Sequence, residues 1–431
     1  MNISKFELLR KNYKRNAFSI SAVEFFWGLG MPVFVESTFL QLFLRKYNAS
    51  HFVVGLVPVF LSIGVPVFSL TSVYVTKHFI NKKYVVSAVH IFAAVPLFLF
   101  GLFMNFDLSD KNVVYLFLLF YGLFSLGIGM TLPVWQNFIV RVFNEEDAIR
   151  GLAVMGITQN VTKILSAFII LKAVSVFDIS RTSVSFIFTA VGLILISGSL
   201  FFLLSAEFAE ADNEDAGLNG LKWFLQSFKT CIKNRNFLMF LGNDTGFLAG
   251  TVVISFYGNY ASELCGIENS VVAGLFAASG FSAGIISQLI FGYFDFLKLK
   301  QKYYAEKFFT FTGILILIMF SGKGAFLAAS FMIGAGRSIR TLAFPHAMKK
   351  ISGKNDATGY FGIAPILTLP LTAGLPVAAG NFLDMTEHTG SLSYRILFSS
   401  MAFIVLLSLF FISKTNFSNR ASVNGFGIRN N

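Results

Sequence analysis

Long apolar segments alternate with short polar ones along almost the whole chain. A helix needs about 20 mostly apolar residues to cross a lipid bilayer, and most of these segments are that long. The pattern therefore predicts an all-α membrane protein with little chain left for a soluble domain. We expect twelve transmembrane helices, at residues 18–43, 53–75, 84–104, 113–140, 151–173, 184–204, 237–260, 270–293, 305–321, 324–345, 358–382 and 395–412.

Composition supports membrane insertion. Hydrophobic residues make up 55% of the 431 residues and charged residues only 13%, whereas a soluble domain has about 25% charged residues. The basic and then apolar amino terminus resembles a signal peptide, but its apolar stretch is too long and lacks a small-residue cleavage site. We therefore interpret it as a retained first helix.

The net charge of +12 could indicate a nucleic-acid partner, so the distribution of the basic residues decides. If both termini are cytoplasmic, 24 of the 34 Lys and Arg residues fall in cytoplasmic segments, seven in outside loops and three within helices. This asymmetry follows the positive-inside rule. It predicts a multi-pass protein with both termini in the cytoplasm and no nucleic-acid partner. The many Phe, Lys and Asn residues are typical of an AT-rich bacterial genome, which suggests the bacterial inner (plasma) membrane.

The longest polar stretch lies between the sixth and seventh segments. It begins acidic and ends in an amphipathic pattern that predicts a short helix on the cytoplasmic membrane surface. The expected domains are an N-terminal six-helix bundle at 1–205, a linker at 206–236, a C-terminal six-helix bundle at 237–413 and a cytoplasmic tail at 414–431.

The two halves carry parallel features that predict an internal repeat. Aligning Gly55 with Gly274 places Glu24 opposite Asn243, and a shift of one residue places Glu24 opposite Asp244. The passage "GIGMTLPVWQ" in the fourth segment also parallels "GAGRSIRTLAFP" in the tenth. Together these matches favour two pseudo-symmetric bundles around a central cavity.

These features resemble the major facilitator superfamily. The passage "GIGMTLPVWQ…NEEDAIRG" (127–151) is similar to one that recurs there at the end of the fourth helix. The loop "SVYVTKHFINKKY" (72–84) departs from the family's best-known motif, with Thr76 near the position of its Asp, so the chain most resembles a divergent, uncharacterised bacterial branch. The resemblance implies that helices 1, 2, 4, 5, 7, 8, 10 and 11 line the cavity while 3, 6, 9 and 12 face lipid.

The placement of charge agrees with that implied arrangement, because a charged side chain inside the bilayer is costly unless it faces water or a partner. The cores of the sixth, ninth and twelfth segments are expected to contain no charge. The charges expected to be buried within helices are Glu24, Glu36, Lys163, Asp244, Arg337 and Arg340.

Four of these residues are candidates for proton coupling or for a gate: Glu24, Asp244, Arg337 and Arg340. Helical rise places Glu24, Asp244 and Arg340 at one depth near the cytoplasmic third, where they can neutralise one another. Arg337 and Arg340 share a helix face. A carboxylate paired with Arg in one conformation and unpaired in the other would carry a proton. A static ion pair that closes a gate or holds the bundles in register is the alternative.

Polar and aromatic residues in the same helices are candidates for the substrate cavity. Lys163 could bind a carboxylate or phosphate of a substrate, or pair with Glu24 or Glu36 instead. Trp27 could stack on a ring or sugar, or serve in packing. The candidate cavity residues are Trp27, Gln136, Gln159, Asn160, Lys163, Asn243 and Gln288.

The sequence as a whole predicts a monomeric secondary transporter that moves a small solute by alternating access, with proton coupling open and export slightly favoured. A lipid translocator or a transporter-like sensor without solute flux remains the alternative. The five His residues form no catalytic cluster, so we expect no enzyme activity and no catalytic residue. Cys231 and Cys265 are expected on opposite sides of the membrane, and neither a metal site nor a cofactor is predicted.

Overall fold

The computed structural model describes residues 5–34, 38–76, 79, 81–143, 145–177, 179–207, 220–294, 297–352 and 358–417. Some features named above fall outside this part of the chain. They are Glu36, the side chains of Thr76 and Gln136, residues 208–219 of the linker and residues 418–431 of the tail.

The N-terminal half forms one helical bundle, followed by a linker helix. Its elements are α1 (Lys5–Lys11), α2 (Tyr13–Phe34), α3 (Thr38–Lys46), α4 (His51–Thr76), α5 (Lys82–Phe103), α6 (Asp110–Val142), α7 (Glu145–Phe177), α8 (Arg181–Ser199), the 3-10 turn η1 (Leu200–Leu204) and the linker helix α9 (Gly220–Lys233).

The C-terminal half forms the second bundle. Its elements are α10 (Arg235–Asn259), the π-helical turns η2 (Tyr260–Leu264) and η3 (Val271–Leu275), α11 (Phe276–Ser287), the π-helical turn η4 (Gln288–Tyr293), α12 (Leu299–Met319), α13 (Lys323–Ser352), α14 (Thr358–Met385), the 3-10 turn η5 (Glu387–Thr389) and α15 (Ser391–Lys414).

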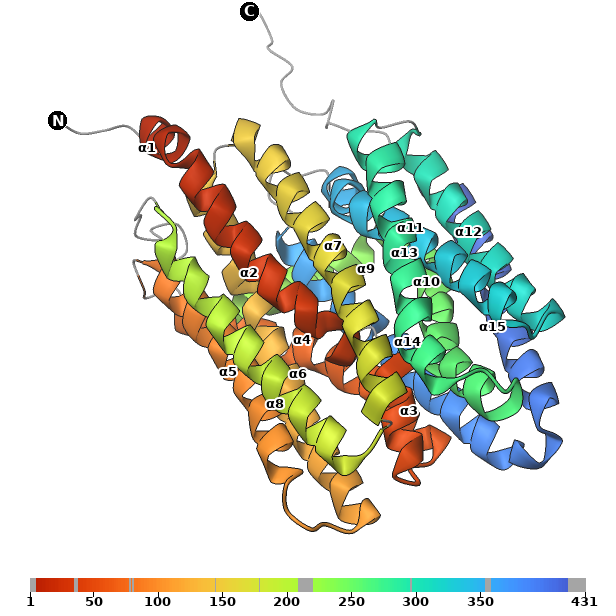
Figure 1. Cartoon of the computed structure of the whole chain (residues 1–431). Helices are drawn as coiled ribbons and strands as arrows, with labels where there is room; N and C mark the ends of the chain where they lie inside the picture. The colour runs from red at the N-terminus through yellow and green to blue at the C-terminus, as the bar shows by residue number, and fades with distance from the viewer. Residues whose placement is uncertain are drawn as a thin grey trace, which may run out of the picture.

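The described chain makes twelve crossings when α2 is joined to α3, α8 to η1, α10 to η2, and α11 to the π-helical turns at its ends. Nine helices of the described residues are long and apolar enough to cross a membrane by composition alone. Figure 1 shows the two bundles side by side, with the long helices roughly parallel. The prediction of an all-α membrane protein with two six-helix bundles is confirmed.

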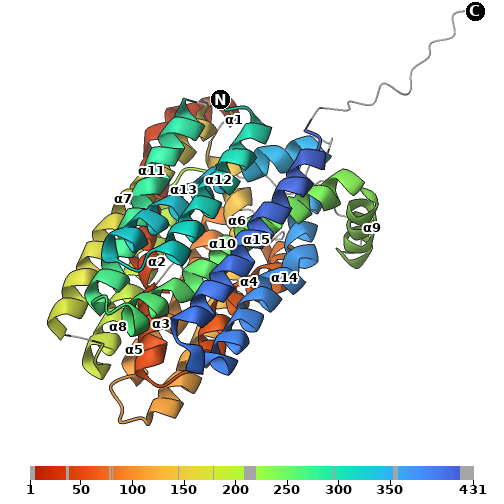
Figure 2. The same cartoon turned by 90° about the vertical axis from the view of Figure 1, so that its right-hand side faces the viewer.

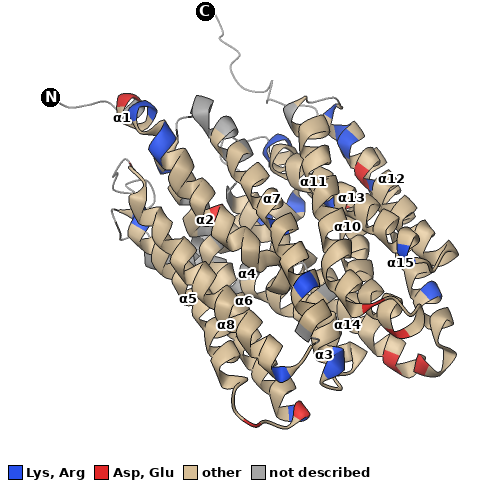
Figure 3. Ribbon diagram, viewed as in Figure 1, with Lys and Arg blue, Asp and Glu red and all other residues tan. Residues whose placement is uncertain are grey.

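The two ends of the bundles are named here by where the chain starts. We call the end that carries α1 and the last turn of α15 the termini side, and the end that carries α3 the far side; α1 lies at the top of Figure 1 and α3 at the bottom. Figure 3 shows that the coloured, charged segments lie mainly toward these two ends while the middle is mostly uncharged. This is the distribution expected when the middle of each helix is in lipid or protein.

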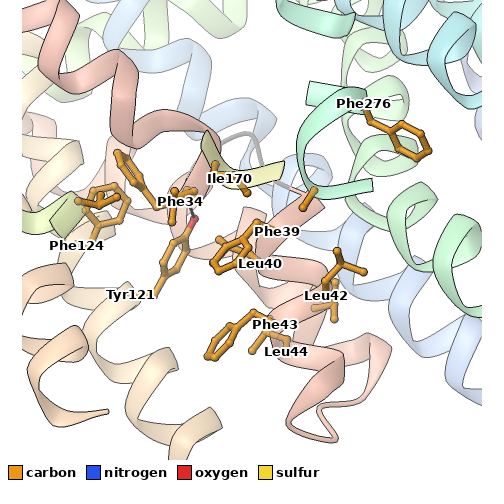
Figure 4. Packing of buried hydrophobic residues seen from close by; sticks show 14 of the residues in the cluster. Phe34, Phe39, Leu40, Leu42, Phe43, Leu44, Tyr121, Phe124, Ile170 and Phe276 are labelled. Atoms are coloured by element: carbon orange, nitrogen blue, oxygen red, sulfur yellow. Dashed lines mark hydrogen bonds between the residues drawn. The ribbon is translucent and has the colours of Figure 1, made fainter. Parts of the chain in front are cut away.

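The first crossing is described in two parts, α2 and α3. The helix α2 includes Phe34 and α3 begins at Thr38, and the residues between them lie outside the described ranges. The Tyr121 hydroxyl donates a hydrogen bond of 2.7 Å to the Phe34 carbonyl. Figure 4 shows Tyr121 pointing to Phe34 from within the apolar core. This hydrogen bond joins α6, the fourth crossing, to the first.

Several helices are longer than their apolar segments predict. The helices α6 and α7 each contain 33 residues, because a helix continues into the polar interface wherever its backbone can be capped. At the start of α6, the Ser109 side chain accepts a hydrogen bond from the Asn112 backbone N–H. Hydropathy therefore marks the part of a helix inside the bilayer and underestimates its full length.

The linker helix α9 is attached to the C-terminal bundle. Phe224 and Phe228 pack against the apolar cluster at the termini side of that bundle, and Asn234, directly after α9, donates a hydrogen bond of 3.0 Å to the Tyr360 hydroxyl. Figure 2 shows α9 on the flank of this bundle near α14. Leu225 and Ile232 remain exposed on its outer face.

Candidate functional site

A cavity of about 320 Å³ lies between the two bundles. From the N-terminal bundle, α2 contributes Met31 to its wall and α7 contributes three polar residues. From the other bundle, α10, α11, η4 and α13 line it. The polar and charged residues among its described lining are Gln159, Asn160, Lys163, Tyr257, Gln288, Ser330, Arg337, Ser338 and Thr341.

The cavity wall is cationic and amide-rich. Among the described lining residues, the charged ones are Lys163 from the N-terminal bundle and Arg337 from the C-terminal bundle. The Asn160 amide donates a hydrogen bond of 3.2 Å to the Gln288 side chain across the two bundles. The Lys163 ammonium also lies 5.5 Å from the ring centre of Phe281. Such a wall attracts an anionic group and offers amides to orient it.

Glu24 lies directly behind this wall. Its side chain is 9% exposed, and its Oε2 accepts a hydrogen bond of 2.6 Å from the Gln159 amide. Glu24 also interacts electrostatically with Lys163. One amide therefore separates the carboxylate from the cavity, and its cationic neighbour is a cavity residue.

Asp244 and Arg340 form a bidentate ion pair in the C-terminal bundle. The Arg340 Nε lies 3.0 Å from Asp244 Oδ1, and Nη2 lies 2.6 Å from Oδ2. The guanidinium also stacks on Phe247 and Phe344, at 4.5 and 3.9 Å from their ring centres. A planar guanidinium matched to both carboxylate oxygens is the strongest geometry for such a pair.

This pairing corrects the expectation that Glu24, Asp244 and Arg340 neutralise one another at one depth. The three residues are split between the bundles, because Gln159 on α7 takes the place beside Glu24 while Arg340 on α13 takes both oxygens of Asp244. Similar depth along parallel helices does not bring side chains together unless the helix faces also meet. Arg337, three residues before Arg340, faces the cavity instead.

Two predicted cavity residues lie elsewhere. Trp27 is buried inside the N-terminal bundle, where its indole N–H donates a hydrogen bond of 3.1 Å to Ser199 and its ring meets His90 edge to face. Asn243 is fully buried beside the Asp244 ion pair. Both are on helices that contribute to the cavity, but their faces of α2 and α10 turn into the bundle interior.

The sequence interpretation missed a buried acid and base on α12. Glu306 and Lys307 are 0% and 1% exposed, and the Lys307 Nζ lies 2.6 Å from Glu306 Oε2. Glu306 interacts electrostatically with Asp244 and Arg340. The core of this crossing was expected to be uncharged because the pair lies at the edge of its apolar segment, next to basic interfacial residues. The signal available was an adjacent acid and base two turns inside the helix.

The sequence interpretation also missed a polar cluster that joins the bundles at the far side. Asp384, near the end of α14, accepts hydrogen bonds of 2.8 Å from the backbone N–H groups of His51 and Phe52. These are the first two residues of α4, so a carboxylate from one bundle caps a helix of the other. The His51 ring lies 3.0 Å from Asp384 Oδ1 and 2.9 Å from the Tyr394 hydroxyl.

Ion pairs extend this far-side cluster. The Arg45 Nε lies 2.7 Å from Glu263 Oε1, and Nη2 lies 3.8 Å from Glu387. Among described residues, the hydrogen bonds between the two bundles fall in three places. The first is this cluster, the second joins the Gln41 amide to the Ile254 carbonyl, and the third joins Asn160 to Gln288. The two bundles are therefore joined at the far side and at mid-height.

Comparison with known proteins places the chain in a family. The family model described as Major Facilitator Superfamily matches residues 17–368. No curated protein sequence matched. Similar solved structures include a mutant of the nucleoside transporter NupG (12% identity, TM-score 0.72, covering 92% of this chain and 99% of that chain). A POT family transporter in complex with 5-aminolevulinic acid is 11% identical (TM-score 0.68; 93% and 96% covered). A bacterial homolog of the human lysosomal transporter Spinster is 13% identical (TM-score 0.63; 93% and 96% covered). At these identities the likeness shows the fold.

Proposed function

Because the chain belongs to the major facilitator superfamily, we propose that it is a secondary active transporter that carries a small anionic solute together with a proton by alternating access. The family and its transporter neighbours indicate a membrane solute transporter rather than an enzyme. The solute class, the coupling and the direction are the proposal developed below.

The observation that carries the proposal is the cationic lining of the cavity. Lys163 on α7 and Arg337 on α13 approach it from opposite bundles, and the amides of Gln159, Asn160 and Gln288 surround them. Arginine binds a carboxylate or phosphate through two parallel hydrogen bonds, and lysine supplies a compact charge. An anion held between them would join the two bundles, which is what a solute must do to stabilise an occluded intermediate.

The proposed proton coupling depends on Lys163, because Glu24 and the anionic solute would compete for its ammonium group. Without a solute, Lys163 interacts with Glu24. An anionic solute competes for the same ammonium, and a buried carboxylate that loses its cation is then stabilised in the protonated form. Solute and proton would therefore bind together. Co-transport of this kind favours uptake driven by an inward proton gradient, in contrast to the slight preference for export drawn from the sequence.

The remaining charged sites have mechanical roles in this proposal. The Asp244 and Arg340 pair holds α10 and α13 together, and the cluster around Asp384 and His51 is the far-side gate. We place the termini side in the bacterial cytoplasm on the strength of its basic charge. The structure would then represent a state closed toward the outside.

The test uses the full-length protein in liposomes that contain a pH dye. Pools of monocarboxylates, dicarboxylates, amino acids, phosphate esters, neutral sugars and cationic drugs are added under an inward-directed proton gradient. We expect solute-dependent proton entry with an anionic pool. Lys163→Met should reduce it by roughly 10- to 100-fold, because a hydrogen bond to a charged group is worth about 1.5–3 kcal/mol. The control Lys172→Met alters an exposed lysine on the same helix and should retain full flux.

Each part of the proposal can fail separately. Flux with neutral sugars alone, or full flux in Lys163→Met, would refute the anionic solute class. Anion flux without proton entry would refute the coupling. If no pool produces flux, the transporter-like sensor and the lipid translocator become the better explanations.

A further inference from the structure

The C-terminal bundle contains a buried ion pair that the proposed mechanism does not use. Glu306 lies seven residues after the start of α12 at Leu299, which is about 10 Å along the helix axis. Its side chain and that of Lys307 are almost completely buried. Neither residue lines the central cavity.

Glu306 has fewer hydrogen-bond donors around it than a buried acid needs to stay ionised. Consecutive residues on a helix do not face each other, so both side chains must bend to bring Glu306 Oε2 within 2.6 Å of Lys307 Nζ. Neither Glu306 oxygen forms a hydrogen bond of good geometry among the described residues, so Oε2 has only the ion pair with Lys307 and Oε1 has no polar partner. A fully ionised buried carboxylate normally has several donors. Glu306 therefore has an open acceptor position that a proton would fill.

The nearby Asp244 is a different kind of acid. Both of its oxygens accept hydrogen bonds from Arg340, which is charged at any physiological pH. A proton on Asp244 would have to displace a guanidinium from a bidentate contact. Of the two neighbouring acids, Glu306 is the one whose protonation breaks only one contact.

The helices packed against α12 supply the surroundings of the pair formed by Glu306 and Lys307. From α10 comes the negative charge of Asp244, and from α13 comes the positive charge of Arg340. From α15 comes the Ser408 hydroxyl. It lies against Gly246, where an added Cβ would meet Ser408 Oγ at 2.5 Å and Lys307 Nζ at 2.9 Å.

Two further polar groups of the same region also lack partners. The Tyr303 hydroxyl, one turn before Glu306 on α12, and both side-chain atoms of Asn243 on α10 are buried without hydrogen bonds among the described residues. Burying several unsatisfied polar groups together is costly. Apolar packing alone therefore does not explain the residues in this region of the bundle.

We propose that Glu306 is a second proton-binding site of this transporter, located inside the C-terminal bundle and separate from the solute cavity. A proton from the aqueous phase binds Glu306, and the Lys307 ammonium is released from it without any other bond breaking. The freed ammonium then competes with Arg340 for Asp244. Because Arg337 lies one turn away from Arg340 on α13, this exchange alters the helix that carries a cavity cation. The role in transport rests on the proposed proton coupling, whereas proton binding itself does not.

The direct test measures proton binding without any solute. Infrared difference spectra are recorded between acidic and alkaline pH on the full-length protein in lipid vesicles. We expect a protonated-carboxyl band that disappears in Glu306→Gln and persists in Asp244→Asn. Glu306→Asp keeps a carboxyl group and should shift the band, which provides the answer if Glu306→Gln does not fold. A band unchanged in both Glu306 variants would overturn the proposal. A component lost only in Glu24→Gln would concern the coupling at Glu24 instead.

The transport test separates a proton site from a static ion pair. In Glu306→Gln we expect proton-driven accumulation of the anion to fall at least about tenfold, while exchange of solute across the membrane stays within about twofold. The double variant Glu306→Gln with Lys307→Met removes both charges. A static pair predicts that this neutral replacement restores accumulation, and a proton site predicts that it does not.

Glu268→Gln is the matched control because Glu268 is exposed in the C-terminal half, and it should behave as the wild type. Restored accumulation in the double variant, or equal loss of exchange and accumulation in Glu306→Gln, would contradict a proton-binding role. If the wild type accumulates no anion at all, the failure lies with the proposed function, and the infrared result still decides the proton site.

Discussion

Glu24 on α2 and Asp244 on α10 are both buried acids in the first crossing of their bundles, yet they have different partners. Asp244 is held by a guanidinium through both oxygens. Glu24 has a neutral amide on one oxygen and interacts with the ammonium of Lys163. Each bundle therefore buries an acid in its first crossing, and the surrounding helices give the two acids different partners.

The difference teaches that the partner of a buried acid, more than its depth, determines what it can do. A bidentate arginine keeps its acid ionised and adds rigidity, because guanidinium does not lose its proton in proteins. An amide stabilises either protonation state of its acid. In the proposed mechanism Glu24 therefore exchanges a proton at the cavity, and Asp244 holds α10 and α13 together.

Arg340→Met should have the largest effect, because it leaves Asp244 buried without its counter-ion. We expect the free energy of unfolding to fall by about 3–5 kcal/mol, measured by denaturation of the purified protein in detergent. Adding Asp244→Asn should recover most of the loss. Arg337→Met, which changes the cavity cation on the same helix, should cost less than about 1 kcal/mol. Equal destabilisation by the two arginine variants would remove the distinction between scaffold and cavity.

Glu24→Gln should separate stability from function. Glutamine can still form a hydrogen bond with Gln159, so the free energy of unfolding should change by no more than about 1.5 kcal/mol. Solute-dependent proton entry into liposomes should fall at least about tenfold, while solute exchange persists. Loss of a protonated-carboxyl infrared band in Asp244→Asn, as in Glu24→Gln, would show that the two acids act alike and would contradict the comparison.

Asp384→Ala should open the far side more often, because Asp384 accepts hydrogen bonds from two backbone N–H groups of α4 and contacts the His51 ring. A shift of about 1–3 kcal/mol corresponds to a roughly 5- to 150-fold change in the population of the open state. The rate at which an impermeant maleimide labels Cys265, a half-buried free cysteine after η2, reports this change.

Asp107→Ala is the control for the gate. Asp107 is exposed and pairs with Arg181 within the N-terminal bundle, so its loss should leave Cys265 labelling unchanged. If Asp384→Ala and Asp107→Ala label at the same rate, the cluster around Asp384 does not act as a gate.

Trp27→Phe should have the smallest effect. It removes the hydrogen bond to Ser199 and should cost about 1 kcal/mol of unfolding free energy, with no change in the solute concentration for half-maximal flux. Trp135→Phe is the control, because the Trp135 indole N–H is buried without a hydrogen-bond partner among the described residues. A higher solute concentration for half-maximal flux in Trp27→Phe, but not in Trp135→Phe, would show that Trp27 contributes to the cavity after all.

The sequence alone determined the class of the molecule and the number of its crossings. Twelve apolar segments predicted twelve crossings, and the passages shared by the two halves predicted two bundles. These features are readable because membrane insertion depends on the apolar character of about 20 consecutive residues. The same local property explains the errors at helix ends, where α6 and α7 run beyond their apolar segments.

Only the tertiary structure decided which polar side chains meet. Glu24 and Gln159 are 135 residues apart in the chain, Asp244 and Arg340 are 96 apart, and His51 and Asp384 are 333 apart. Each contact depends on how a helix is rotated about its axis and where it packs, and neither quantity is encoded in one segment's hydropathy. The buried pair at Glu306 and Lys307 has the same origin. Its helix begins at the interface, and the packing of α10, α13 and α15 around it encloses charges that the sequence pattern assigns to the membrane surface.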